Sequence, residues 1–91
     1  MHTRIYRYEL TSETPSISVP QGAIIIDAMP CKHHLNLYIL ADLRSPRETR
    51  YFRFFRTGEE LPDFIWDCVH VKTLPGGAHF FEVPAHLIQP A

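Results

Sequence analysis

Short extended runs, separated by proline and glycine, dominate this 91-residue sequence and constrain its fold more than any other feature. Several of the runs alternate apolar and polar residues, which is the pattern of strands with one buried face. Only Glu59 to Ile65 has the character of a helix, and Pro62 interrupts it, so we expect a loop or a single helical turn there. The pattern predicts a β-rich fold with almost no helix.

The runs predict seven strands joined by turns. They cover Arg4–Leu10, Ser16–Val19, Ala23–Met29, Leu35–Ala41, Thr49–Thr57, Trp66–Leu74 and Ala78–Val83. Adjacent glycines in Pro75-Gly76-Gly77 permit the positive φ angles of a tight hairpin between the last two strands. This spacing predicts one all-β domain over residues 1–91, built as an antiparallel β-sandwich or a small open barrel.

One of these runs, Ala23–Met29, contains the consecutive isoleucines Ile24 to Ile26. β-Branched runs without alternation are typical of strands that are buried on both faces. We therefore predict that this segment is a central strand.

Charge and composition limit the classes of partner. The formal net charge is −1 and hydrophobic residues make up 45% of the chain, so we expect a packed core and no strong overall preference for nucleic acid or membranes. No apolar stretch approaches the ~18 residues that cross a bilayer, and the start Met1 to Arg4 has no export signal. We expect a cytoplasmic protein in which Cys31 and Cys68 are free thiols.

The most unusual local feature is a concentration of arginine and aromatic residues. Residues 44–56 hold five of the chain's 9 lysines and arginines, among one tyrosine and three phenylalanines. On a strand, Arg50, Phe52, Phe54 and Arg56 would share one face, and Tyr51, Arg53 and Phe55 the other. Guanidinium groups pair with phosphate or carboxylate oxygens, and aromatic faces stack on bases. The candidate partner-binding residues are therefore Arg44, Arg47, Arg50, Tyr51, Arg53 and Arg56.

The same segment has a purely structural interpretation. Aromatic residues in strands usually belong to the core, and the arginines would then form a solvated rim. Nearby carboxylates that would partly neutralise this rim are Glu59, Glu60, Asp63 and Asp67. Both interpretations are open at the level of sequence.

Two Cys-x-His pairs offer a second candidate site. Cys31 with His33, and Cys68 with His70, would each place two zinc-type ligands on one strand face. Structural zinc sites more often use Cys-x2-4-Cys turns, and the first pair follows Pro30 in an expected loop. We therefore expect no metal and no cofactor, with Cys68 as a small core residue and the histidines at the surface or at strand edges.

The known signatures of enzymes are absent from the sequence. It has no glycine-rich phosphate loop, no Gly-x-Ser-x-Gly and no His-Glu-x-x-His motif. We therefore expect a binding protein with no catalytic residues.

A series of short segments carries a resemblance that spans most of the chain. The segments are Ile5-Tyr6-Arg7-Tyr8-Glu9-Leu10, Val19-Pro20-Gln21-Gly22-Ala23, Leu37-Tyr38-Ile39-Leu40-Ala41-Asp42, Glu48-Thr49-Arg50-Tyr51-Phe52-Arg53, Thr57-Gly58 and Leu74-Pro75-Gly76-Gly77-Ala78. In this order they resemble a family of small uncharacterised proteins encoded mainly by bacteriophages and prophages. The resemblance implies a phage or prophage context and a compact β fold, without a biochemical activity. Members usually carry histidine after the Thr-Gly and a Gly-Thr before the final hairpin, where this chain has Glu59 and Val69-His70-Val71.

The leading hypothesis is a small phage-type accessory protein, located in the cytoplasm of the host cell, that inhibits a host factor such as a defence system without catalysis. It would block the surface of a host protein or sequester a small anionic, nucleotide-like ligand, with Arg50, Arg53 and Arg56 supplying charge. One alternative is a nucleic-acid-binding module that uses the same segment. Another is a structural or assembly protein that forms a homodimer or a larger homo-oligomer.

Overall fold

The computed structural model describes residues 2–11 and 15–88, and these residues form seven β-strands and two short 3-10 helices. The strands are β1 (Thr3–Leu10), β2 (Ser16–Pro20), β3 (Ile24–Cys31), β4 (His34–Asp42), β5 (Arg47–Arg56), β6 (Val69–Leu74) and β7 (Ala78–Val83), and the helices are η1 (Asp63–Asp67) and η2 (Ala85–Leu87). The predicted all-β class is confirmed. Over these two ranges, no helix is long and apolar enough to cross a membrane.

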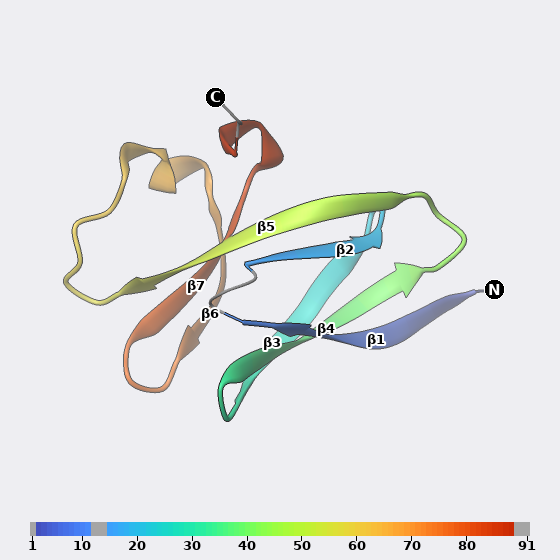
Figure 1. Cartoon of the computed structure of the whole chain (residues 1–91), viewed down its shortest axis with the longest axis horizontal. Coiled ribbons are helices and arrows are strands. Elements are labelled where there is room, and N and C mark those ends of the chain that lie inside the picture. The colour runs from blue at the N-terminus through green and yellow to red at the C-terminus, as the bar shows by residue number, and fades with distance from the viewer. Residues whose placement is uncertain (1, 12–14, 89–91) are drawn as a thin grey trace.

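The strands form two antiparallel sheets that share one core (Figure 1). The first sheet has the strand order β1-β4-β3, and the second has the order β2-β5-β7-β6. Alternate residues of the strands point into the space between the sheets, and their burial holds the two layers together. The core residues are Leu10, Ile17, Val19, Ala23, Ala28, Leu35, Leu37, Ile39, Ala41, Phe52 and Phe80.

β5 connects the two halves of the second sheet. Its first half, Arg47 to Tyr51, pairs with β2, and its second half, Tyr51 to Arg56, pairs with β7. The two neighbouring strands are therefore offset along β5, with only Tyr51 in register with both. As a result, the β6–β7 hairpin extends past the end of β2, to the left in Figure 1.

Aromatic rings pack on both faces of β5. On the inner face, the rings of Phe52 and Phe80 are stacked at 5.0 Å, and Phe54 lies 4.8 Å from Phe80. On the outer face, Phe55 packs edge-on against Phe81 with the centroids 5.8 Å apart. β5 therefore contributes to the core and also to a smaller aromatic cluster outside it.

The prediction that Ala23–Met29 is a central strand is wrong, because β3 lies at the edge of its sheet and β4 occupies the centre. A β-bulge between Ile25 and Asp27 breaks the alternation of β3. Ile25 packs against the core, whereas Ile24 and Ile26 are 57% and 49% exposed. The apolar run Ile24 to Ile26 therefore belongs to an edge strand with a bulge and not to a strand with neighbours on both sides.

The strand predicted from Trp66 to Leu74 begins later, at Val69. Trp66 belongs instead to η1, which starts directly after Pro62. Proline suits the start of a helix, because its φ angle is preset and its missing N–H has no helical partner there. Pro62 therefore opens a short helix instead of interrupting a longer one, and Trp66 is left 90% exposed.

The central position of β4 and the edge position of β3 predict different effects of the same substitution, isoleucine to valine. Ile39→Val on β4 removes a methylene from a fully buried side chain, and we expect it to lower the free energy of unfolding by about 0.5–1.5 kcal/mol. Ile24→Val on β3 is the matched control and should change it by less than about 0.5 kcal/mol. Chemical denaturation of both variants measures the difference. A loss at Ile24 as large as that at Ile39 would contradict the edge position of β3.

Candidate functional site

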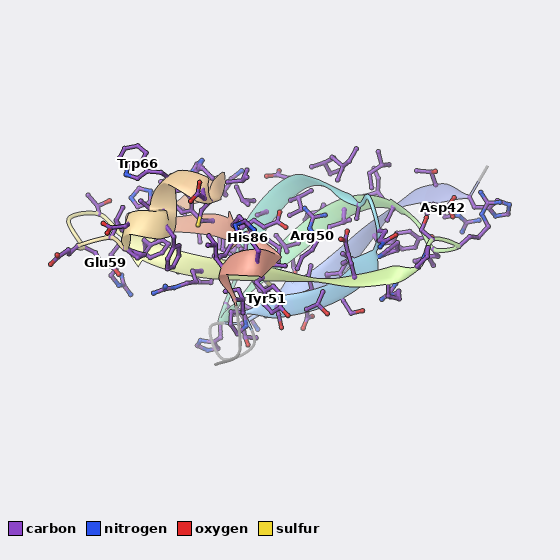
Figure 2. All side chains as sticks on the ribbon, turned by 90° about the horizontal axis from the view of Figure 1, so that it is seen from above. Asp42, Arg50, Tyr51, Glu59, Trp66 and His86 are labelled. Atoms are coloured by element: carbon purple, nitrogen blue, oxygen red, sulfur yellow. The ribbon has the colours of Figure 1, made fainter. Side chains whose placement is uncertain are left out.

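The predicted partner-binding arginines are spread along the molecule and do not form one cluster. β5 has 10 residues, which corresponds to a length of about 33 Å. In Figure 2, Asp42, which binds Arg44, and Glu59, which binds the backbone of Arg56, lie toward opposite ends, with Arg50 between them. The local partners of each arginine therefore decide which of them is available to a ligand.

Arg44 is held by a carboxylate in the turn before β5. Its Nη2 donates to Asp42 Oδ2 at 2.9 Å, and its Nε donates to Asp42 Oδ1 at 3.1 Å. These side-chain hydrogen bonds, with one from the backbone N–H of Arg44, lower the pKa of Asp42 from 3.8 to about 2. The positive charge of Arg44 is therefore compensated within the chain.

Arg50 is the most fully engaged of the arginines. Its Nε and Nη2 donate to the two carboxylate oxygens of Glu82, both at 2.7 Å, and its Nη1 donates to the carbonyl of Ala23. The Arg50 and Glu82 side chains are only 18% and 21% exposed, and their hydrogen bond raises the pKa of Arg50. Arg50 thus joins β5 to β7 and to the start of β3, which is a structural role.

Two further arginines are also engaged within the chain. Arg47 Nη2 donates to the carbonyl of Ser18 at 2.9 Å. The guanidinium carbon of Arg53 lies over the rings of Phe55 and Phe64, at 4.9 and 5.7 Å from their centroids. This cation–π arrangement covers the outer aromatic cluster. Tyr51 on the same strand is half-buried.

Arg56 lies at a hollow of about 400 Å³ between the β3–β4 turn and the β6–β7 hairpin, and we name it the tip hollow. Both turns point downward in Figure 1. Lys32 and Arg56 line the hollow, and neither side chain takes part in an ion pair with another of the described residues. The lining residues are Leu10, Pro30, Lys32, His33, His34, Leu35, Phe54, Arg56, Glu59, Leu74 and Ala78.

The tip hollow combines apolar and cationic groups. Leu10 and Leu35 are buried and border it from the core, whereas Lys32 and Arg56 are exposed. Two carboxylates lie close by and reduce the positive charge. Glu59 Oε1 accepts a hydrogen bond from the backbone N–H of Arg56 at 2.7 Å, and a Glu9 oxygen lies 3.8 Å from a ring nitrogen of His34.

Lys32 has an unusual backbone conformation. Its φ angle is 52°, and no other non-glycine residue in the described part of the chain has a positive φ. A side chain in this left-handed region costs about 1–2 kcal/mol, so glycine is the usual residue there. Backbone strain of this kind clusters at ligand sites. The strained turn keeps a lysine, with its charge, at the edge of the tip hollow.

A series of hydrogen bonds fixes the β6–β7 hairpin beside Arg56. Thr57 Oγ1 lies 2.6 Å from His79 Nε2, and His79 Nδ1 lies 2.9 Å from Thr73 Oγ1. Thr73 Oγ1 is also 2.9 Å from His70 Nε2. The backbone N–H of Thr57 donates to the carbonyl of Gly77 at 3.0 Å. The end of β5 is therefore tied to the hairpin that borders the tip hollow.

The alternative metal site is not formed. Residues 2–11 and 15–88 contain no group of three or more potential ligands that could hold a metal ion. The four candidate ligands Cys31, His33, Cys68 and His70 therefore do not come together. The reason lies in the fold: the first pair is at the β3–β4 turn, whereas His70 contacts Phe81 in the second sheet. Both cysteines are free thiols.

Sequence reasoning missed most of the tip hollow. Of the predicted partner-binding residues, only Arg56 lines the hollow. His33, which belonged to the alternative metal site, also lines it. The available signal was the basic run Lys32-His33-His34, placed directly after Pro30 and a cysteine. The apolar residues gave no signal, because they come from separate strands and each has the pattern of an ordinary core position.

The chain belongs to a family that is described as a domain of unknown function, DUF7352, since the family model matches residues 1–89. No curated protein and no solved structure matches the chain.

The Asp42–Arg44 pair predicts a pH dependence in the acid range. Because the folded pKa of Asp42 is about 2, below its ordinary 3.8, the charged carboxylate stabilises the fold above about pH 4, and this contribution is lost as the pH falls toward 2. In an NMR titration the Asp42 carboxyl carbon should show a midpoint near 2, and Arg44→Gln should raise it toward 3.8. An unchanged midpoint in the variant would show that Arg44 is not the cause.

Proposed function

We propose that this member of the DUF7352 family is a non-enzymatic binding protein that sequesters a small organic anion, of the size and chemistry of a nucleotide, in the tip hollow. The observation that carries the proposal is a pair of cations, Lys32 and Arg56, that form no ion pair with residues 2–11 or 15–88 and lie beside an apolar surface in one hollow of about 400 Å³.

The charges of the hollow favour an anion. Lys32 and Arg56 come from different sheets and line the same hollow, so both positive charges favour an anion bound there. The imidazoles of His33 and His34 add further hydrogen-bonding groups at the same edge. The carboxylate of Glu59 reduces the net positive charge of the hollow. Removing this carboxylate therefore tests the preference for an anion directly.

The apolar lining favours an organic anion over a simple inorganic ion. The half-buried side chains of Phe54 and Leu74 would contact the uncharged part of a ligand, and the ring of Phe54 offers a surface for a planar group. Hollows of this size are at the lower end of the range in which proteins bind small molecules.

The geometry gives less support to the nucleic-acid alternative. A single-stranded nucleic acid needs a continuous positive groove with stacking rings along it. Here Arg44, Arg47 and Arg50 donate to acceptors within the chain, and the exposed Arg53 covers rings that are already packed.

For the biological setting, we propose the role that the resemblance to phage and prophage proteins implies. The protein would act in the host cytoplasm, where binding of the anion would withhold it from a host factor, such as a defence protein, that depends on it. Under this proposal inhibition needs no catalysis and requires only that the protein be present in excess over the ligand.

Isothermal titration calorimetry with AMP, adenosine and inorganic phosphate tests the binding function. We expect AMP to bind best, because adenosine lacks the charge and phosphate lacks the apolar part. Arg56→Ala and Lys32→Gly should each weaken AMP binding by about tenfold or more, since each removes a charge-assisted contact. Lys32→Gly also relieves the positive φ angle, so its loss of binding would not come from unfolding.

Two controls make the test specific. Arg44→Ala removes an arginine that is far from the hollow and should leave AMP binding unchanged, whereas Glu59→Gln removes the opposing charge and should strengthen it. Equal binding of AMP and adenosine, or equal loss in Arg44→Ala and Arg56→Ala, would refute the tip hollow as an anion site.

A further inference from the structure

A second hollow, of about 500 Å³, lies between the edge strands of the two sheets, and we name it the β3–β6 groove. In the described part of the chain, β3 pairs only with β4, and β6 pairs only with β7. The remaining edges of β3 and β6 border the groove from either side. In Figure 2, β3 and η1 with the labelled Trp66 lie along the same side of the molecule.

The walls of the groove are apolar and unusually exposed. Ile24, Ile26 and Val69 line it, and they are 57%, 49% and 62% exposed. Large aliphatic side chains grouped at this level of exposure mark interaction sites more often than scattered single residues do.

The charged residues of the groove are already paired with one another. Arg50 binds Glu82 at its base, and Lys72 Nζ donates to Asp27 Oδ1 across it at 2.8 Å. A charged occupant would therefore have to break an existing pair or remain unpaired, which costs free energy. Charge complementarity favours an occupant without charged side chains.

The outer edge of β3 is capped at both ends, and its middle, next to the bulge between Ile25 and Asp27, has no ladder partner among the described strands. The carbonyl of Ala23 accepts from Arg50, and the N–H of Ala28 donates to Asp27 Oδ1. Between these caps, no described strand pairs with the outer edge at Ile24 to Ile26. Backbone groups on such an edge bind an extended segment, because β-addition supplies the missing ladder hydrogen bonds.

We propose that the β3–β6 groove is a docking site for an extended, uncharged segment of a partner protein, which adds to the edge of β3 at Ile24–Ile26 and packs β-branched or aromatic side chains against Ile26 and Val69. This interaction surface is separate from the tip hollow and does not depend on the proposed binding of an anion.

Selection from a displayed library of random peptides of about ten residues, followed by synthesis of the consensus peptide, tests the proposal. We expect the selected peptides to share an uncharged core of alternating β-branched or aromatic residues. Ile26→Lys and Val69→Lys should each weaken binding of the synthetic peptide by at least about tenfold. Ile5→Lys is the control, because Ile5 is 60% exposed on β1 and lies outside the groove.

N-Methylation of single peptide residues separates edge pairing from simple apolar contact. Loss of binding should occur at alternate residues of the peptide, as a ladder of hydrogen bonds requires. A charged consensus, equal binding by the Ile26→Lys variant, or no effect of any N-methyl group would each overturn the proposal.

Two further measurements test whether the occupant is a second copy of this chain and whether the groove is independent of the tip hollow. If the protein alone sediments as a dimer that Ile26→Lys dissociates, the occupant is a second copy of this chain and the partner proposal is wrong. The double variant Lys32→Gly/Arg56→Ala should bind the peptide as the wild type does, so a failure at the tip hollow does not affect this test.

Discussion

The offset of β2 and β7 along β5 determines how the two sheets of this protein meet. Because β5 pairs with β2 over its first half and with β7 over its second, the second sheet extends beyond β2 in one direction and beyond the β6–β7 hairpin in the other. The stacked rings of Phe52 and Phe80 fix this register from inside the core. A shift of either strand by one residue would turn its own ring out of the core and break the stack, so the register is strongly specified.

Both hollows follow from that offset. The β6–β7 hairpin extends beyond β2; its β6 strand lies beside β3, and Phe80 of β7 packs in the core shared by the two sheets. Near the tips of the hairpins this leaves the tip hollow with Lys32 and Arg56. Between the sheet edges it leaves the β3–β6 groove, whose charges are already paired. The two surfaces therefore differ in chemistry as well as in position.

Much of the fold could be predicted from the sequence, because alternation and turn residues are local signals. The hairpin at Gly76 and Gly77 has the positive φ angles that its sequence requires. Strand order was not predictable in the same way: the isoleucines of β3 have the composition of a central strand, yet the bulge and the missing neighbour expose two of them. Such features depend on contacts between distant segments.

The site was less predictable than the fold. The arginines of residues 44–56 stood out by number, but their availability depends on partners elsewhere in the chain, such as Glu82 for Arg50. Lys32 lies far from Arg56 in sequence and reaches the same hollow only through the packing of the two sheets. A basic turn and the last residue of a strand are weak signals when they are read separately.

In the proposed function, the cations that bind the ligand are those at the tip hollow and not the arginine-rich segment as a whole. A titration of ¹⁵N-labelled protein with AMP, followed by amide chemical shifts, tests it most directly. We expect the largest shifts at residues 32–35 and 56–59, with little change at residues 44–50. Shifts that concentrate at residues 44–50, or that are absent at both 32–35 and 56–59, would contradict the proposal.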